Sequence, residues 1–242
     1  MSGENLNDLK EVEEDLKFNM DDSILLLFKA LSSFIPNGPL PILLELILPS
    51  IVDRQNKWII SLNETVKEHG KKIDKLQPKN LVKNPNFITI LIQATQIATR
   101  NHQEEKLEAL RNAVLNSALE TSIEEDMQLM FLNLIDSFTV YHMKILLLIH
   151  NPNKYLKNIN KKPLDNHSTL IELIEYAFPE LDGQEVFFKA IWNDLYNRNL
   201  FETSSTNMFS IYTNWRDPKT SELGNKFVLF MKSPLENIEI KY

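Results

Sequence analysis

Residues 121–149 read TSIEEDMQLMFLNLIDSFTVYHMKILLLI, and this stretch decides the fold class. Thr121 and Ser122 can cap a helix, and Glu124 and Glu125 would place two acids in its first turn, where the helix dipole favours negative charge. Apolar side chains then follow on every face as far as Ile149. A helix that is apolar all round must be packed on several sides. We therefore expect one central helix that runs to about Ile149 and is surrounded by others.

The segment before it predicts a second long helix, from Pro85 to about Leu119. Asn84 is a good capping residue, and proline suits the first helical position. One face of this helix is apolar and the other is charged, and we single out four charged residues as a candidate interaction surface: Arg100, Glu104, Glu108 and Arg111. The acids could also form a catalytic face with general acid–base carboxylates. A solvated helix surface is the commoner meaning of such a pattern.

Two apolar runs, residues 22–34 and 40–52, are separated by a turn sequence, Ile35-Pro36-Asn37-Gly38-Pro39. Each run is shorter than the roughly 20 residues that a transmembrane helix needs. We therefore expect a buried helix pair, preceded by an amphipathic helix over residues 4–18. The alternative is a membrane-seeking hairpin formed by residues 24–52. From Asp53 the helix is expected to continue towards Lys75, with a loop over 76–83.

The C-terminal part predicts a small module of another kind. We expect helices over 168–178, 183–199 and 222–231. Residues 208–213 predict a strand, because β-branched and aromatic residues alternate there with period two. The second helix is expected to bury Val186, Phe187, Ala190, Ile191, Leu195 and Tyr196. This order of elements is that of a winged helix.

The fold class expected from these patterns is mainly α: an antiparallel helical bundle followed by a small winged-helix-like α+β module. Residues 151–167 are rich in asparagine, lysine and proline and predict a linker. The expected organisation is a helical domain over 1–150, this linker, and a winged-helix-like domain over 168–242.

Several segments carry a resemblance to a known family. They are Ile35-Pro36-Asn37-Gly38, the helix from Arg54 to Trp58, the sequence EKLEALRNA at 105–113, and Leu223-Gly224-x-x-Phe227 near the C-terminus. Together they resemble bacterial proteins of the abortive-infection alpha group and their uncharacterised neighbours, which have a helical front and a winged-helix-like tail. The resemblance extends over roughly the whole chain. It implies a role in phage defence and assigns no chemistry to any position.

The sequence offers no motif for a reaction, a metal or a nucleotide. It contains no cysteine, which excludes a disulfide scaffold, a thiol nucleophile and a thiolate zinc site. None of the five histidines forms a His-Glu-x-x-His motif, and no glycine-rich phosphate loop occurs. His142 lies in the dense apolar stretch and is expected to be a hydrogen-bonded core residue. We therefore expect a protein that is not an enzyme and has no cofactor and no metal.

The net charge and its distribution along the chain indicate which class of partner is favoured. The net charge is −7, whereas a nonspecific nucleic-acid binder is normally basic. Residues 164–242 hold twelve acids against seven lysines and arginines. Lys189 and Arg198 on the expected recognition helix, with Trp215 and Arg216 on the expected wing, complete the candidate interaction surface. Because phosphate contacts need several cations, a protein partner is favoured over DNA. The distribution is uneven, since residues 53–83 carry eight lysines and arginines against four acids.

These observations favour a non-enzymatic interaction or adaptor protein. The family resemblance implies that it belongs to a bacterial anti-phage defence system. Its partner would be another protein or a second copy of itself. Two alternatives stay open: a membrane-acting effector that uses residues 24–52, and a winged-helix DNA-binding regulator. The N-terminus lacks the basic and apolar regions of a secretory signal, so a cytoplasmic location is expected.

Overall fold

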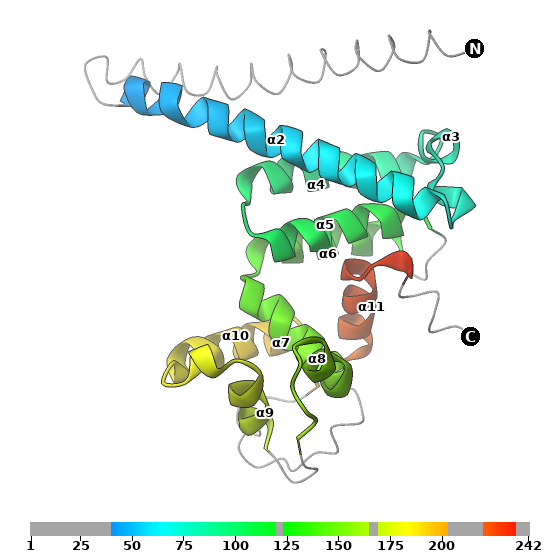
Figure 1. The fold of residues 1–242 in the computed structure, drawn as a ribbon. Coiled ribbons are helices and arrows are strands. Elements are labelled where there is room, and N and C mark those ends of the chain that lie inside the picture. Colours follow the sequence, from blue (N-terminus) through cyan, green and yellow to red (C-terminus); the bar gives the residue numbers. More distant parts are fainter. Residues whose placement is uncertain (1–39, 120–122, 165–168, 203–219, 236–242) are drawn as a thin grey trace. The chain divides into compact units, whose positions relative to one another are not determined.

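The chain is mainly α-helical, as the sequence predicts. A computed structural model describes residues 40–119, 123–164, 169–202 and 220–235, and for 40–49 it describes the backbone alone. Within these ranges it contains ten α-helices, 77% of the residues are helical, and there are essentially no strands. Figure 1 shows the ribbon.

The helices differ widely in length. The α-helices are α2 (Leu40–Gly70), α3 (Pro78–Leu81), α4 (Pro85–Arg100), α5 (Glu104–Ser117), α6 (Glu125–Ser137), α7 (Val140–His150), α8 (Pro152–Asn158), α9 (Leu170–Ala177), α10 (Glu185–Asn197) and α11 (Glu222–Met231). There are also two 3-10 turns, η1 (Asp74–Leu76) and η2 (Pro179–Leu181). The chain divides into two compact units, residues 1–60 and 61–242. The described part of the first unit is the start of α2. The second unit contains every feature discussed below.

The long helix expected over 85–119 is in fact two helices, α4 and α5. Asn84 caps α4 by accepting a hydrogen bond from the Phe87 N–H at 3.1 Å, as its position predicts. At the other end Asn101 is extended, and its side chain donates to the Ile97 carbonyl at 2.8 Å. Glu104 and Glu105 then form the acidic first turn of α5. Glu104, which was predicted to lie on the charged face of one long helix, thus stands at the start of a second helix. The break before it allows α5 to pack against α4.

The helix expected to run to Ile149 is also divided, into α6 and α7. Phe138 and Thr139 are extended, and Thr139 begins α7 with a capping box in which His142 takes the place usually held by Glu or Gln. The apolar pattern continues without change across this break, because both helices are buried. Periodicity alone therefore could not reveal it.

The core of the second unit forms around α5. This helix packs against α4, α6 and α11, and α7 packs against α8, α10 and α11 (Figure 1). Four buried phenylalanines connect these elements. Phe131 lies 5.0 Å from Phe227 and 5.7 Å from Phe230, and Phe138 lies 5.9 Å from Phe227, measured between ring centroids. Such pairs add roughly 0.5–1.5 kcal/mol each beyond the area that they bury.

The last helix, α11, is part of this core. Asn112 and Asn116 on α5 donate their side-chain N–H groups to the carbonyls at its C-terminal end, Asn112 to Met231 at 2.9 Å and Asn116 to Phe230 at 3.0 Å and Lys232 at 2.8 Å. At its N-terminal end the Ser221 side chain caps the helix by accepting a hydrogen bond from the Gly224 N–H at 2.9 Å. A Cβ on Gly224 would lie 2.2 Å from the Leu200 carbonyl oxygen. The Leu-Gly-x-x-Phe pattern is thus explained by close packing.

No winged-helix β module is seen in the described part of the chain, where strand pairing is limited to one antiparallel bridge between Phe201 and Thr220. The expected strand over 208–213 lies outside the described residues. The expected linker contains α8, which Asn151 caps through the Lys154 N–H. The domain limits at 150 and 168 stay a prediction.

The buried face of α10 differs from the expected one. Phe188, Ile191, Trp192 and Leu195 are buried, whereas Val186 is 85% exposed and Phe187 and Tyr196 are more than a third exposed. Trp192 determines this orientation, because its large ring packs 4.5 Å from the ring of Phe201. The prediction was correct for Ile191 and Leu195 and wrong for Val186, Phe187, Ala190 and Tyr196, which are all exposed.

Across the described ranges, none of the helices combines the length and the apolar character needed to cross a lipid bilayer. Residues 24–39 of the expected hairpin lie outside those ranges.

Candidate functional site

The four charged residues singled out on α4 and α5 do not form one surface cluster. Arg100 forms an ion pair with Asp136 of α6 at 2.9 Å. Arg111, whose side chain is only 14% exposed, bonds to Glu104 within α5. Glu108 alone lines a cavity. Three of the four residues therefore make structural contacts within the chain.

The two cations expected on the recognition helix are also paired. Lys189 bonds to Glu185 at 3.3 Å and Arg198 to Asp194 at 3.0 Å, each one turn apart on α10. Exposed pairs of this kind contribute only a few tenths of a kcal/mol. Arg198 also lies 5.3 Å from the centroid of the Phe138 ring, so it is engaged within the chain. Trp215 and Arg216 lie outside the described residues.

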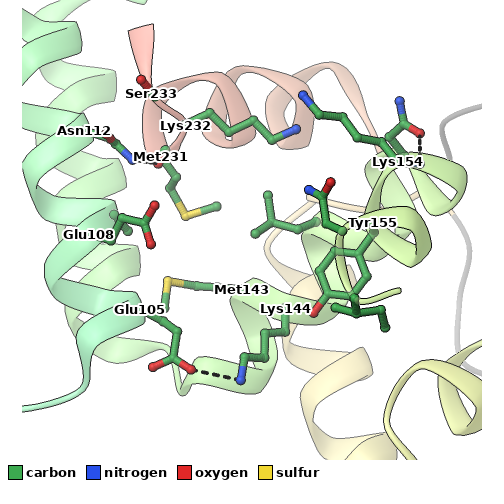
Figure 2. A pocket seen from close by; sticks show the side chains of 15 residues that line it. Glu105, Glu108, Asn112, Met143, Lys144, Lys154, Tyr155, Met231, Lys232 and Ser233 are labelled. Carbon is green, nitrogen blue, oxygen red and sulfur yellow. Dashed lines mark hydrogen bonds and ion pairs between the residues drawn. The ribbon is translucent and has the colours of Figure 1, made fainter. Parts of the chain in front are cut away.

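The cavity reached by Glu108 is the candidate site. It has a volume of about 300 Å³ and lies between α5, α7, α8 and the end of α11 (Figure 2). We call it the α5/α7 groove. Its lining combines acids, lysines, amides and apolar side chains: Glu105, Glu108, Asn112, Met143, Lys144, Leu147, Asn151, Lys154, Tyr155, Asn158, Ile159, Met231, Lys232 and Ser233, with Ala109.

The charges of the groove are arranged by helix. Glu105 and Glu108 come from α5, whereas Lys144 comes from α7 and Lys154 from α8 (Figure 2). One ion pair joins the two sides, since Lys144 Nζ lies 2.9 Å from a Glu105 carboxylate oxygen. The hydrogen bond from Lys144 lowers the pKa of Glu105, so this carboxylate stays charged. The groove thus offers one acidic side and one basic side.

The floor of the groove is apolar. The thioethers of Met143 and Met231 both project into it (Figure 2), and both residues are buried. Methionine adapts its shape to a ligand because its chain is unbranched and its sulfur is polarizable. Asn112 holds Met231 in place through the main-chain hydrogen bond already described. The floor is therefore deformable while its backbone is fixed.

Tyr155 closes one end of the groove. Burial raises the pKa of its phenol to about 12, and the charges of Glu180 and Glu105 act in the same direction. The phenol consequently remains protonated at neutral pH and can act as a hydrogen-bond donor. Its ring packs edge-on against that of Phe178, with an interplanar angle of 66° and 5.8 Å between the ring centroids, which restricts its orientation.

Another cluster has the residue types of a hydrolytic triad. His142 Nδ1 lies 2.8 Å from Thr139 Oγ1, and Nε2 lies 3.4 Å from Asp194 Oδ2. However, Nδ1 also accepts the Thr139 backbone N–H at 3.2 Å, so its lone pair is already engaged in the helix cap. Burial lowers the pKa of His142, and the Asp194 charge opposes this shift. His142 is thus a hydrogen-bonded core histidine, as predicted.

Metal coordination has no support in the described ranges, where no group of three or more His, Asp or Glu side chains is placed to hold an ion.

Sequence reasoning missed most of the groove. Lys144, Lys154, Tyr155 and Lys232 were not singled out, whereas Glu105 was considered only as part of the charged face of its helix. One signal was present, since Lys144 is the single charged residue between 140 and 149 apart from the histidine. A lone lysine in such an apolar helix marks the point where the helix reaches solvent or an ionic partner.

Comparison with known proteins adds no identity: no protein-family profile, curated protein or solved structure matches the chain. The described residues define an all-α protein with a charged, methionine-floored groove.

Proposed function

We propose that this protein is a non-enzymatic interaction component that binds a short peptide segment of another protein in the α5/α7 groove. The observation that carries the proposal is the lining of the groove, with acids on α5, lysines on α7 and α8, and two methionines between them. Methionine-rich surfaces suit side chains of varied shape, and charged borders set register and orientation.

The size of the groove favours a single peptide side chain as its occupant over a cofactor. About 300 Å³ is at the lower limit of small-molecule pockets. An aliphatic or aromatic anchor would fill the space over Met143 and Met231. A basic residue of the peptide would face Glu108, and an acidic one would face Lys154. The anti-phage setting is proposed from the family resemblance of the sequence.

Selection from a random peptide library, followed by affinity measurement with fluorescence polarization, tests this function. We expect enriched peptides to share an apolar anchor next to a basic residue. The Glu108→Lys variant should reverse the preference, so that an acidic residue replaces the basic one. A variant that merely misfolds would bind nothing and could not change the selected charge.

Glu175→Lys is the matched control. Glu175 is exposed on α9, outside the groove, and the substitution makes the same change in charge. It should leave the selected sequences unchanged. The proposal is wrong if no peptide is enriched, or if Glu108→Lys selects the same sequences as the original chain.

A further inference from the structure

A group of exposed lysines lies at the end of α2 and continues through η1 and α3 to the start of α4. We call it the lysine tip, and it consists of Lys67, Lys71, Lys72, Lys75, Lys79 and Lys83, all of them exposed. Residues 67–83 hold these six lysines against two acids, in a chain whose net charge is −7. One of the acids, Asp74, lies 3.8 Å from Lys79. The excess positive charge of the tip favours an anionic partner.

The other residues of the tip favour a lipid surface over a nucleic acid. Residues 61–86 contain no arginine and no Phe, Tyr or Trp, and the one histidine in this range, His69, is buried. They therefore lack the exposed aromatic rings and the arginines on which bases stack. Val82, in contrast, is 70% exposed between Lys79 and Lys83. Lysines around an exposed aliphatic side chain suit an anionic membrane surface, which attracts the charges and accepts the apolar group.

A second cavity, of about 420 Å³, adjoins the tip. Its lining includes Lys75 and the amides Asn80, Asn84, Asn86 and Gln128. The Asn86 side-chain N–H group donates to Gln128 Oε1 at 3.1 Å, but its Oδ1 is buried and has no hydrogen-bond partner among the residues that the structure describes. Buried acceptors are rarely left unsatisfied in native proteins. A donor is therefore expected at this position, and a hydroxyl group of a ligand would supply it.

We propose that the lysine tip binds the surface of an anionic membrane, and that the adjoining cavity takes a phosphodiester headgroup that bears free hydroxyls. Tip lysines would contact the lipid phosphates, Val82 would enter the interface, and a headgroup hydroxyl would donate to Asn86 Oδ1. Glu125 also lines the cavity and offers a second acceptor for a hydroxyl. This surface is distinct from the α5/α7 groove.

Vesicle binding by the full chain tests the proposal. Vesicles would contain phosphatidylcholine alone, or phosphatidylcholine with an equal fraction of phosphatidylglycerol or phosphatidylmethanol. The last two lipids have the same charge, and only phosphatidylglycerol has headgroup hydroxyls. We expect binding to both anionic vesicles, preference for phosphatidylglycerol, and weakening as salt is raised.

Paired charge reversals separate the tip from general charge effects. Lys71→Glu combined with Lys83→Glu should weaken binding about 30-fold or more, since each lysine near an anionic surface contributes about fivefold. Lys157→Glu combined with Lys162→Glu makes the same change in charge at exposed positions elsewhere and should have little effect. Circular dichroism would verify that both variants fold. Glu108→Lys, which tests the groove, should leave vesicle binding unchanged.

Four results would overturn the proposal. Absence of binding to anionic vesicles at low salt would exclude the membrane surface. Equal losses in the two paired variants would show a general effect of net charge. Equal binding to phosphatidylglycerol and phosphatidylmethanol would exclude the hydroxyl contact in the cavity. Tighter, tip-dependent binding to single-stranded RNA than to any vesicle would assign the tip to nucleic acid.

Discussion

Replacement of Gly224 by alanine should destabilise the protein, although alanine is the better helix former. The position lies within α11, where Gly→Ala normally contributes about 1 kcal/mol of stability. Here a Cβ would meet the Leu200 carbonyl oxygen at 2.2 Å and its carbon at 3.1 Å. Both atoms belong to the backbone, so neither can move away by a change of rotamer.

The magnitude follows from these two opposed effects. Forcing extra atoms into a packed core costs typically 1–3 kcal/mol and occasionally more. The cost should lie at or above the upper end, because α11 and the segment at Leu200 must separate by more than about 1 Å to restore van der Waals contact. After subtraction of the helix gain, we expect a net loss of about 2 kcal/mol. In a chain of this size, that lowers Tm by about 4–8 °C.

Urea unfolding followed by circular dichroism measures this loss directly. Gly183→Ala is an informative control because Gly183 has φ of +73° and open space around it. There the cost comes from backbone conformation, at about 1–2 kcal/mol. The reasoning is refuted if Gly224→Ala is as stable as the original chain or more stable. That result would mean that α11 does not approach Leu200 closely.

Three further predictions concern buried or half-buried polar groups. Asn116→Ala should cost about 1–3 kcal/mol in urea unfolding, because it leaves carbonyls at the end of α11 without donors, whereas the exposed Asn153→Ala should change stability by less than about 0.5 kcal/mol. Lys106→Ala should cost a similar amount, since the buried ammonium donates to the Asp136 carbonyl at 2.9 Å; full stability in this variant would contradict that role. Burial, followed by the charge of Lys232, lowers the pKa of His150 below 6.5, so the unfolded chain binds more protons and stability should fall as the pH drops through 6.5. His150→Gln should flatten that decline in a series of unfolding curves, and an unchanged decline in this variant would contradict the assignment.

The helical class and several helix starts could be predicted from the sequence. Asn84 with Pro85, and Ser221 before Glu222, are local signals that act through the nearest backbone N–H groups. The core role of His142 was also evident from its apolar surroundings. Such features depend on a few neighbouring residues, so a tertiary structure is not needed to infer them.

The helix breaks were harder to predict because burial hides them. At 101–103 the polar residues fit both an exposed helix face and a loop. At Thr139 the capping partner is His142 instead of an acid or a glutamine, so the usual pattern is absent. In both places the two helices on either side of the break pack on shared neighbours.

The candidate site depended still more on the tertiary structure. Glu105 and Lys144 are 39 positions apart in the sequence, and their ion pair arises only because α7 crosses near the start of α5. Arg100, in contrast, was expected to be available to a binding partner, but it forms an ion pair with Asp136 within the chain. Charge on a helix face shows that the face is polar, and its partners are determined by folding.

What the sequence determined by itself is therefore local: the helical class, the caps at Asn84 and Ser221, and the uneven distribution of charge that places lysines at 67–83. The tertiary structure decided which charges remain available, where Gly224 must lie against Leu200, and which side chains surround the α5/α7 groove. The physical reason is the distance along the chain over which each interaction acts. Capping and helix propensity act over one turn, whereas ion pairs, close backbone contacts and cavities require segments that are distant in the chain to meet.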